Sequence, residues 1–170
     1  MSIDFGILTI SDRSAAGKRE DLSGPALSRA VREAGWQVSQ TALVPDEHQQ
    51  IVDVLSSWAD DALCSVILTT GGTGFSPRDI TPEATRAVIE RDAPGLAEAM
   101  RSGSLQITPH AMLSRAVVGI RKNTLIVNLP GSPKGALENF RILVPVLVHA
   151  VQLLQGDQAA EEGHHPGRAV

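Results

Sequence analysis

The stretch that decides the fold is residues 65–79, SVILTTGGTGFSPRD. Residues 65–69 form a continuous apolar, β-branched run, which is typical of a strand buried on both faces of a parallel sheet. Three glycines within four residues follow this strand directly. Such a loop lets the backbone approach a ligand and turn its N–H groups toward an anion. The alternative is a tight turn that only needs positive φ.

The glycine loop is neither of the two common phosphate-binding motifs. No Lys-Ser/Thr pair ends it, so it is not a Walker A loop. Pro77 stands where the dinucleotide fingerprint would place a third glycine after Gly72 and Gly74. At the end of the loop, Arg78 and Asp79 are suited to a phosphate and a metal ion, or else to a surface ion pair.

Strand and helix patterns alternate on both sides of this stretch. We expect strands at 5–10 and 37–44, and a hairpin of 116–120 and 124–129 around a three-residue turn, 121–123. Helices are expected at about 25–34, 46–58, 81–88, 96–101, 109–114 and 136–155. The pattern predicts an α/β fold, a three-layer α/β/α sandwich with a mostly parallel central sheet.

Several helix details are also predicted. Asp46 and Thr81 stand where N-caps are expected. The last helix is apolar almost all round, which predicts deep packing, and Pro145 should kink it.

The composition limits the classes of protein to which this chain can belong. The 170 residues fit one domain, residues 1–156, followed by a flexible tail, 157–170, without hydrophobic period. The net charge of −4 speaks against nucleic-acid binding, and the single Cys64 excludes an intramolecular disulfide. The N-terminus shows no secretory signal, and the longest apolar stretch, 142–154, is too short and too interrupted for a membrane span. We therefore expect a cytoplasmic protein.

Four loops should open on one edge of the sheet, because ligands bind outside the carboxyl ends of parallel strands. These loops are residues 11–13, 45–47, 71–74 and 130–132. They offer backbone amides, hydroxyls and carboxylates, a composition that suits phosphate plus metal. Asp46 and Asp79 are of interest as a pair, because magnesium takes one or two carboxylates plus phosphate oxygens. The loop with Ser132 could hold a second anion, or could be only a rigid connection.

Residues 71–85, GGTGFSPRDITPEAT, resemble the signature of the MogA/MoaB-type molybdenum-cofactor proteins. They are especially similar to the G domains of gephyrin and its plant counterpart. Residues 128–136, NLPGSPKGA, and 8–12, LTISD, match as well, so the resemblance runs from about residue 7 to 156. It implies the MogA-like fold and the adenylation of molybdopterin, in which ATP and molybdopterin give adenylyl-molybdopterin and pyrophosphate.

The resemblance also implies roles for individual residues. Asp46 and Asp79 match the family's catalytic aspartates, with Asp79 as the partner of Mg²⁺. The residues expected around the nucleotide are Ser11, Asp12, Gly71, Gly72, Thr73, Gly74, Pro130, Gly131 and Ser132. Those expected to bind substrate are Arg78, Ser114 and Arg115, the last two near the pterin. A homotrimer and hand-over of the product to a molybdate-inserting enzyme are implied as well.

Two rival functions come from other classes. One is a non-catalytic trimeric carrier of the MoaB type that binds molybdopterin without adenylating it, and the other is a scaffold. The presence of both Asp46 and Asp79 favours the enzyme, because binding alone needs no metal-holding pair.

Overall fold

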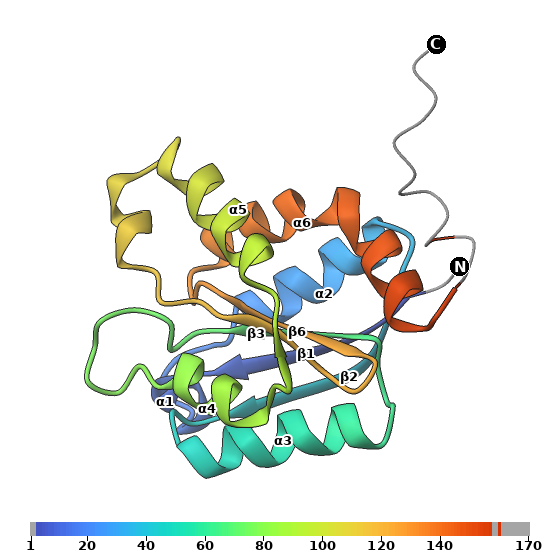
Figure 1. The fold of residues 1–170 in the computed structure, drawn as a ribbon. Helices are drawn as coiled ribbons and strands as arrows, with labels where there is room; N and C mark the ends of the chain where they lie inside the picture. The colour runs from blue at the N-terminus through green and yellow to red at the C-terminus, as the bar shows by residue number, and fades with distance from the viewer. Residues whose placement is uncertain (1–2, 158–159, 161–170) are drawn as a thin grey trace.

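The computed structural model describes residues 3–157 and 160 (Figure 1). In this part of the chain one six-stranded sheet has the order β2-β1-β3-β6-β5-β4. Its strands are β1 (Asp4–Ile10), β2 (Gln37–Val44), β3 (Val66–Thr70), β4 (Arg91–Asp92), β5 (Val118–Arg121) and β6 (Thr124–Leu129). The four strands β2, β1, β3 and β6 are parallel, whereas β5 and β4 are antiparallel to their neighbours. The prediction of a mostly parallel sheet is confirmed.

Helices cover both faces of the sheet and complete three layers (Figure 1). They are α1 (Asp12–Ala15), α2 (Ser23–Glu33), α3 (His48–Asp60), α4 (Thr81–Val88), α5 (Pro94–Leu105) and α6 (Pro133–Leu154), with a 3₁₀ turn, η1 (Pro109–Leu113). Helices α2, α5 and α6 lie on one face, and α3 and α4 lie on the other (Figure 1). The three-layer prediction is confirmed.

Strand β3 separates two hydrophobic clusters. Val66 and Leu68 belong to the cluster beneath α2 and α6, whereas Ile67 belongs to the cluster against α3 and α4. All three side chains are fully buried, because successive strand residues point to opposite faces and both faces are covered. The apolar run at 65–69 is therefore the doubly buried strand that its composition predicted.

Several predicted boundaries were wrong. Helix α5 runs from Pro94 to Leu105 and not over 96–101, and β5 begins at Val118 and not at 116. Arg121 pairs with Thr124, so the hairpin turn has two residues and not three, and Lys122 takes a φ of +49° in it. Helix α6 begins at Pro133 and not at 136, because the Ser132 side chain caps it by accepting from the N–H of Gly135 at 3.2 Å.

Helix α6 buries one side only. Phe140, Leu143 and Leu147 are buried, but Val146 is 45 % exposed, so the prediction of deep packing all round was wrong. By length and apolar composition it is the one helix of the described residues that could cross a membrane. Its buried side packs against α2, α5 and β6 in the manner of a core helix. The expected kink at Pro145 stays a prediction.

The predicted tail, 157–170, falls mostly outside the described residues. Within the described part, Ala160 is buried. The boundary at residue 156 stays a prediction.

Candidate functional site

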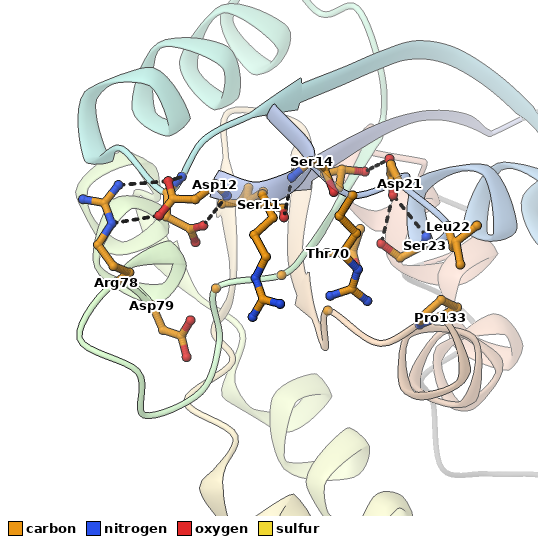
Figure 2. Close-up of a pocket in the computed structure, with 18 of the residues that line it drawn as sticks. Ser11, Asp12, Ser14, Asp21, Leu22, Ser23, Thr70, Arg78, Asp79 and Pro133 are labelled. Atoms are coloured by element: carbon orange, nitrogen blue, oxygen red, sulfur yellow. Dashed lines mark hydrogen bonds and ion pairs between the residues drawn. The ribbon is translucent and has the colours of Figure 1, made fainter. Parts of the chain in front are cut away.

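The four loops that follow the parallel strands meet at one cavity of about 510 Å³ (Figure 2). Ser11 and Asp12 come from the end of β1, Asp46 from the end of β2, and Gly71 and Gly72 from the end of β3. The loop after β6 contributes to the same wall. The prediction that these loops open on one edge is confirmed.

The first glycine loop passes so close to its neighbours that side chains do not fit. Gly71 has a φ of +109°, and a Cβ there would lie 2.1 Å from the carbonyl oxygen of Ile10. Gly72 has a φ of +64°, and a Cβ there would lie 2.4 Å from Oγ1 of Thr81 and 2.9 Å from Oδ1 of Asp46. Both interpretations of the glycine loop therefore hold. The glycines adopt positive φ, and they let the backbone approach closely at the wall of a cavity.

Hydrogen bonds from Thr81 and Thr70 help to fix the glycine loop to its surroundings. The Thr81 hydroxyl donates to the carbonyl of Gly71 at 2.8 Å, and the Thr81 N–H donates to the carbonyl of Gly72 at 3.1 Å. Thr81 was predicted as a helix cap, which is wrong: it makes no cap bond, because its hydroxyl is committed to the loop. The Thr70 hydroxyl donates to the carbonyl of Pro130 at 2.7 Å and so joins the two loops.

Asn128 fixes the strands beneath both loops. Its Nδ2 donates to the hydroxyls of Thr69 at 3.0 Å and Thr85 at 2.8 Å, and its Oδ1 accepts from the N–H of Val117 at 3.2 Å. These partners belong to β3, α4 and the segment before β5, and Asn128 is fully buried. A buried amide with satisfied partners rigidifies the elements that it joins.

Asp12 and Asp46 form a reciprocal pair. The N–H of Asp12 donates to Oδ2 of Asp46 at 2.9 Å, and the N–H of Asp46 donates to Oδ1 of Asp12 at 3.0 Å. The prediction that Asp46 caps the following helix was wrong: α3 has Glu47 at its N-cap position, without a side-chain cap bond. Burial raises the pKa of the Asp46 carboxyl, and the charges of Asp12 and Asp79 raise it further.

Arg78 is paired with carboxylates. Its Nε and Nη2 each donate to Asp12 at 2.9 Å (Figure 2), and Nη2 also donates to Glu47 at 2.7 Å. The hydrogen bonds from Arg78 hold the pKa of Asp12 below its usual range. The alternative of a surface ion pair is thus realised, but with Asp12 and not with the adjacent Asp79.

Asp79 faces the cavity from the far end of the glycine loop, where its Oδ2 accepts from the N–H of Ser76 at 3.0 Å (Figure 2). Among the described residues no group of three or more His, Cys, Asp or Glu side chains could hold a metal ion alone. Asp46 and Asp79 nevertheless fit magnesium, which binds through one or two carboxylates and takes its other ligands from water and phosphate. A cation there would offset the mutual repulsion that raises the pKa of Asp46.

Arg115 is committed to the glycine loop. Its Nε donates to the carbonyl of Gly74 at 2.7 Å, its Nη2 donates to the carbonyl of Asp79 at 2.5 Å, and its Nη1 pairs with Glu83. Its N–H also donates to the carbonyl of Thr73 at 2.9 Å. The guanidinium therefore clamps the loop and brackets residues 73–79.

A second cavity, of about 290 Å³, lies against the two loops that follow β3 and β6. All the predicted residues but Arg115, which lines neither cavity, divide between the two. The larger is lined by Ser11, Asp12, Asp46, Gly71, Gly72, Arg78, Asp79 and Gly131. The smaller is lined by Thr73, Gly74, Ser114, Pro130 and Ser132.

The sequence did not single out several residues of these walls. Arg19 and Asp21 line the larger cavity, and Arg101, His110 and Asn139 line the smaller one. The last three come from α5, η1 and α6, and no local motif marks them. Arg19 and Asp21 follow the LTISD segment in the chain, and this proximity was the one signal available.

Comparison with known proteins gives consistent similarities. Residues 6–149 match the family described as "Probable molybdopterin binding domain". The chain is 47 % identical over 158 residues to the molybdenum cofactor synthesis protein cinnamon of Drosophila melanogaster, covering 92 % of this chain and 26 % of that protein. It is 40 % identical over 169 residues to molybdopterin adenylyltransferase of Escherichia coli, covering 91 % of this chain and 87 % of that enzyme. The chain thus spans about a quarter of the insect relative and most of the bacterial one.

The fold also matches a solved structure. The molybdopterin biosynthesis enzyme MoaB of Thermus thermophilus superposes with a TM-score of 0.86 at 49 % identity. The match covers 91 % of this chain and 98 % of that one.

Proposed function

The chain belongs to the molybdopterin-binding family, and from this we propose that it is a molybdopterin adenylyltransferase. It transfers AMP from ATP to the terminal phosphate of molybdopterin and releases pyrophosphate. The observation that carries the proposal is the junction of two cavities at the two loops after β3 and β6. One cavity takes the nucleotide and the other takes the pterin, so the reacting phosphates meet at the shared wall.

The larger cavity suits the nucleotide, because it collects the carboxylates Asp12, Asp46 and Asp79 and the backbone of Gly71 and Gly72. The smaller cavity suits the pterin, because Thr73 and Ser114 on its wall supply hydroxyls and it extends between α5, η1 and α6. The bacterial proteins to which the chain is similar over most of its length are molybdopterin adenylyltransferases, and this reaction needs room for both substrates.

The chemistry needs alignment and charge neutralisation, and it needs no dedicated base. An oxygen of the pterin phosphate, already anionic, forms a bond to the α-phosphorus, and the bond from that phosphorus to the α,β-bridging oxygen breaks. The bridging oxygen keeps the electron pair and leaves as part of pyrophosphate. Holding both phosphates in line removes most of the entropic barrier.

Asp46 and Asp79 would hold Mg²⁺ at the nucleotide phosphates. When bound, the ion supplies positive charge to phosphate oxygens that repel one another. The reciprocal bonds between Asp12 and Asp46 fix the direction of the Asp46 carboxylate, and the bond from Ser76 fixes that of Asp79. Arg78 offsets the charge of Asp12, which leaves Asp46 and Asp79 for the cation.

The proposal includes an assembly and a place in the cell. We expect a cytoplasmic homotrimer that hands its product to a molybdate-inserting enzyme. The exposed apolar side chains of Ile107, Met112 and Leu113 at η1 offer a surface for self-association. Light scattering should give a mass three times the 18.0 kDa of the chain, and a monomer at micromolar concentration would contradict the trimer.

The test of the reaction is pyrophosphate release from ATP, measured with and without molybdopterin and with and without Mg²⁺. We expect release only when both are present, because no histidine among the described residues lines the larger cavity to activate water. Release that does not depend on molybdopterin would contradict the proposal. Tight binding of molybdopterin without any release would favour the carrier.

A further inference from the structure

The larger cavity must bind a polyanion, yet several cations near it are already paired. Arg78 pairs with Asp12 and Glu47, and Arg115 is held by the glycine loop. Lys134 faces Glu138 at 3.8 Å. Beside the cation that Asp46 and Asp79 would hold, a nucleoside triphosphate therefore needs positive charge from another part of the wall.

Arg13 and Arg19 supply it. Both line the larger cavity and both are exposed. Within residues 3–157 and 160, neither side chain makes an ion pair or a hydrogen bond. Two unpaired guanidinium groups beside a cavity are suited to phosphate, because the planar fork of donors matches phosphate oxygens.

The local backbone brings the two arginines to the same wall. The N–H of Lys18 donates to the carbonyl of Arg13 at 2.9 Å and closes the turn, which Gly17 permits with a φ of +69°. The turn is anchored before its start, where the N–H of Ser11 donates to the carbonyl of Val44 at 2.9 Å. The position of the turn is therefore fixed, although its long side chains reach into solvent.

The other end of the turn is anchored by the carboxylate of Asp21, which already accepts hydrogen bonds from neighbouring residues. Asp21 accepts from the Thr9 hydroxyl at 2.7 Å and from the N–H of Ser23 at 3.1 Å (Figure 2), and it also accepts from the N–H of Gly24 at 3.0 Å. It thereby accepts from the first two N–H groups of α2, and within the described residues it forms no ion pair with Arg13 or Arg19. The turn carries Arg13, Lys18 and Arg19 against Glu20, and the flanking acids are Asp12, which pairs with Arg78, and Asp21.

We propose that Arg13 and Arg19 form a diphosphate subsite, which binds the β- and γ-phosphates of ATP and then the leaving pyrophosphate. The inference rests on the proposed function and deepens it by assigning residues to the triphosphate end of the nucleotide. When the bridging oxygen takes the electron pair of the broken bond, the leaving group gains negative charge. The two arginines can bind that charge without first breaking an ion pair within the protein.

The test measures the binding of ATP, pyrophosphate, AMP, molybdopterin and inorganic phosphate to wild type, Arg13→Ala, Arg19→Ala and the double variant by titration calorimetry. Each single substitution should weaken ATP and pyrophosphate about fivefold to tenfold, because an exposed charged hydrogen bond is worth less than a buried one. AMP lacks the β- and γ-phosphates, so its affinity should stay unchanged. The matched control is Lys18→Ala, which removes the same charge from the same turn but does not line the cavity.

Several outcomes would overturn the subsite. These are wild-type protein that binds no pyrophosphate, a double variant that binds ATP and pyrophosphate as wild type does, and an equal loss for AMP. Loss of molybdopterin and inorganic phosphate binding, with pyrophosphate binding kept, would assign the arginines to the pterin phosphate and would also overturn it. Wild-type protein that binds ATP through these arginines but forms no adenylylated product would refute the proposed function and leave the subsite standing.

Discussion

Replacing Arg115 with alanine tests whether this residue holds the glycine loop or binds substrate. The change removes the donors to the carbonyls of Gly74 and Asp79 and the pair with Glu83. The Arg115 side chain is 32 % exposed, so each charged hydrogen bond is discounted to about 1 kcal/mol from the usual ~1.5–3 kcal/mol. The exposed ion pair adds about 0.5 kcal/mol. The expected loss of about 2–3 kcal/mol lowers the Tm by about 4–12 °C in a chain of this length.

The assay is thermal unfolding followed by circular dichroism, beside titration with molybdopterin. Arg29→Ala is the matched control, because Arg29 is exposed on α2 and makes no side-chain bond or ion pair within the described residues; it should change stability by less than about 0.5 kcal/mol. A Tm for Arg115→Ala within about 1 °C of wild type would refute the clamp. If that unchanged Tm came with weaker pterin binding, the substrate role implied by the family resemblance would stand instead.

Three further predictions concern the aspartates and the glycine loop. Asp79→Asn should reduce pyrophosphate release at least about a hundredfold at unchanged Tm, because the amide oxygen can still accept the loop N–H but the charge for the cation is gone; release within threefold or so of wild type would remove Asp79 from the mechanism. Gly71→Ala should cost more than about 3 kcal/mol, since its Cβ would lie 2.1 Å from a backbone oxygen of β1 at a φ of +109°; Gly95→Ala, with nothing within 4 Å, is the control, and equal urea midpoints would contradict the close approach. Hydrogen bonds from Arg121 hold the pKa of Asp60 at about 2, so its stabilisation is complete above its unfolded pKa of about 3.9 and is lost as the pH falls through about 2; the stability difference between wild type and Asp60→Asn should therefore shrink below about pH 4, and a constant difference would show that no such pairing exists.

Periodicity predicted five of the six strands of the sheet for a physical reason, and it missed β4, whose two residues are too few to show a period. A strand covered on both faces, such as β3, has no polar face to confuse its pattern, and Val66, Ile67 and Leu68 all occupy core positions. Parallel strands then bring their carboxyl ends to one edge, so the four loops of the site could be predicted to meet.

The direction of individual side chains could not be predicted in this way. An aspartate shortly before a helix looks the same whether it caps the helix or turns to a partner. Asp46 turns to Asp12, 34 residues earlier, because the parallel pairing of β1 with β2 brings the two backbones together. The same holds for Thr81, whose hydroxyl reaches the carbonyl of Gly71 and not its own helix.

The walls of the smaller cavity could not be predicted from the sequence, for a related reason. Arg101, His110 and Asn139 lie on three elements that tertiary packing brings together. No spacing along the chain marks such a wall. The glycine loop, by contrast, is local and was visible in the sequence.

The most direct test of the central proposal is mass spectrometry of the product formed by wild-type protein from ATP, Mg²⁺ and molybdopterin. We expect a species in which AMP is joined to the terminal phosphate of molybdopterin, together with an equal amount of pyrophosphate, and neither should form with Asp79→Asn. Tight binding of molybdopterin by the wild type, without that species at any Mg²⁺ concentration, would contradict the adenylyltransferase and identify a carrier.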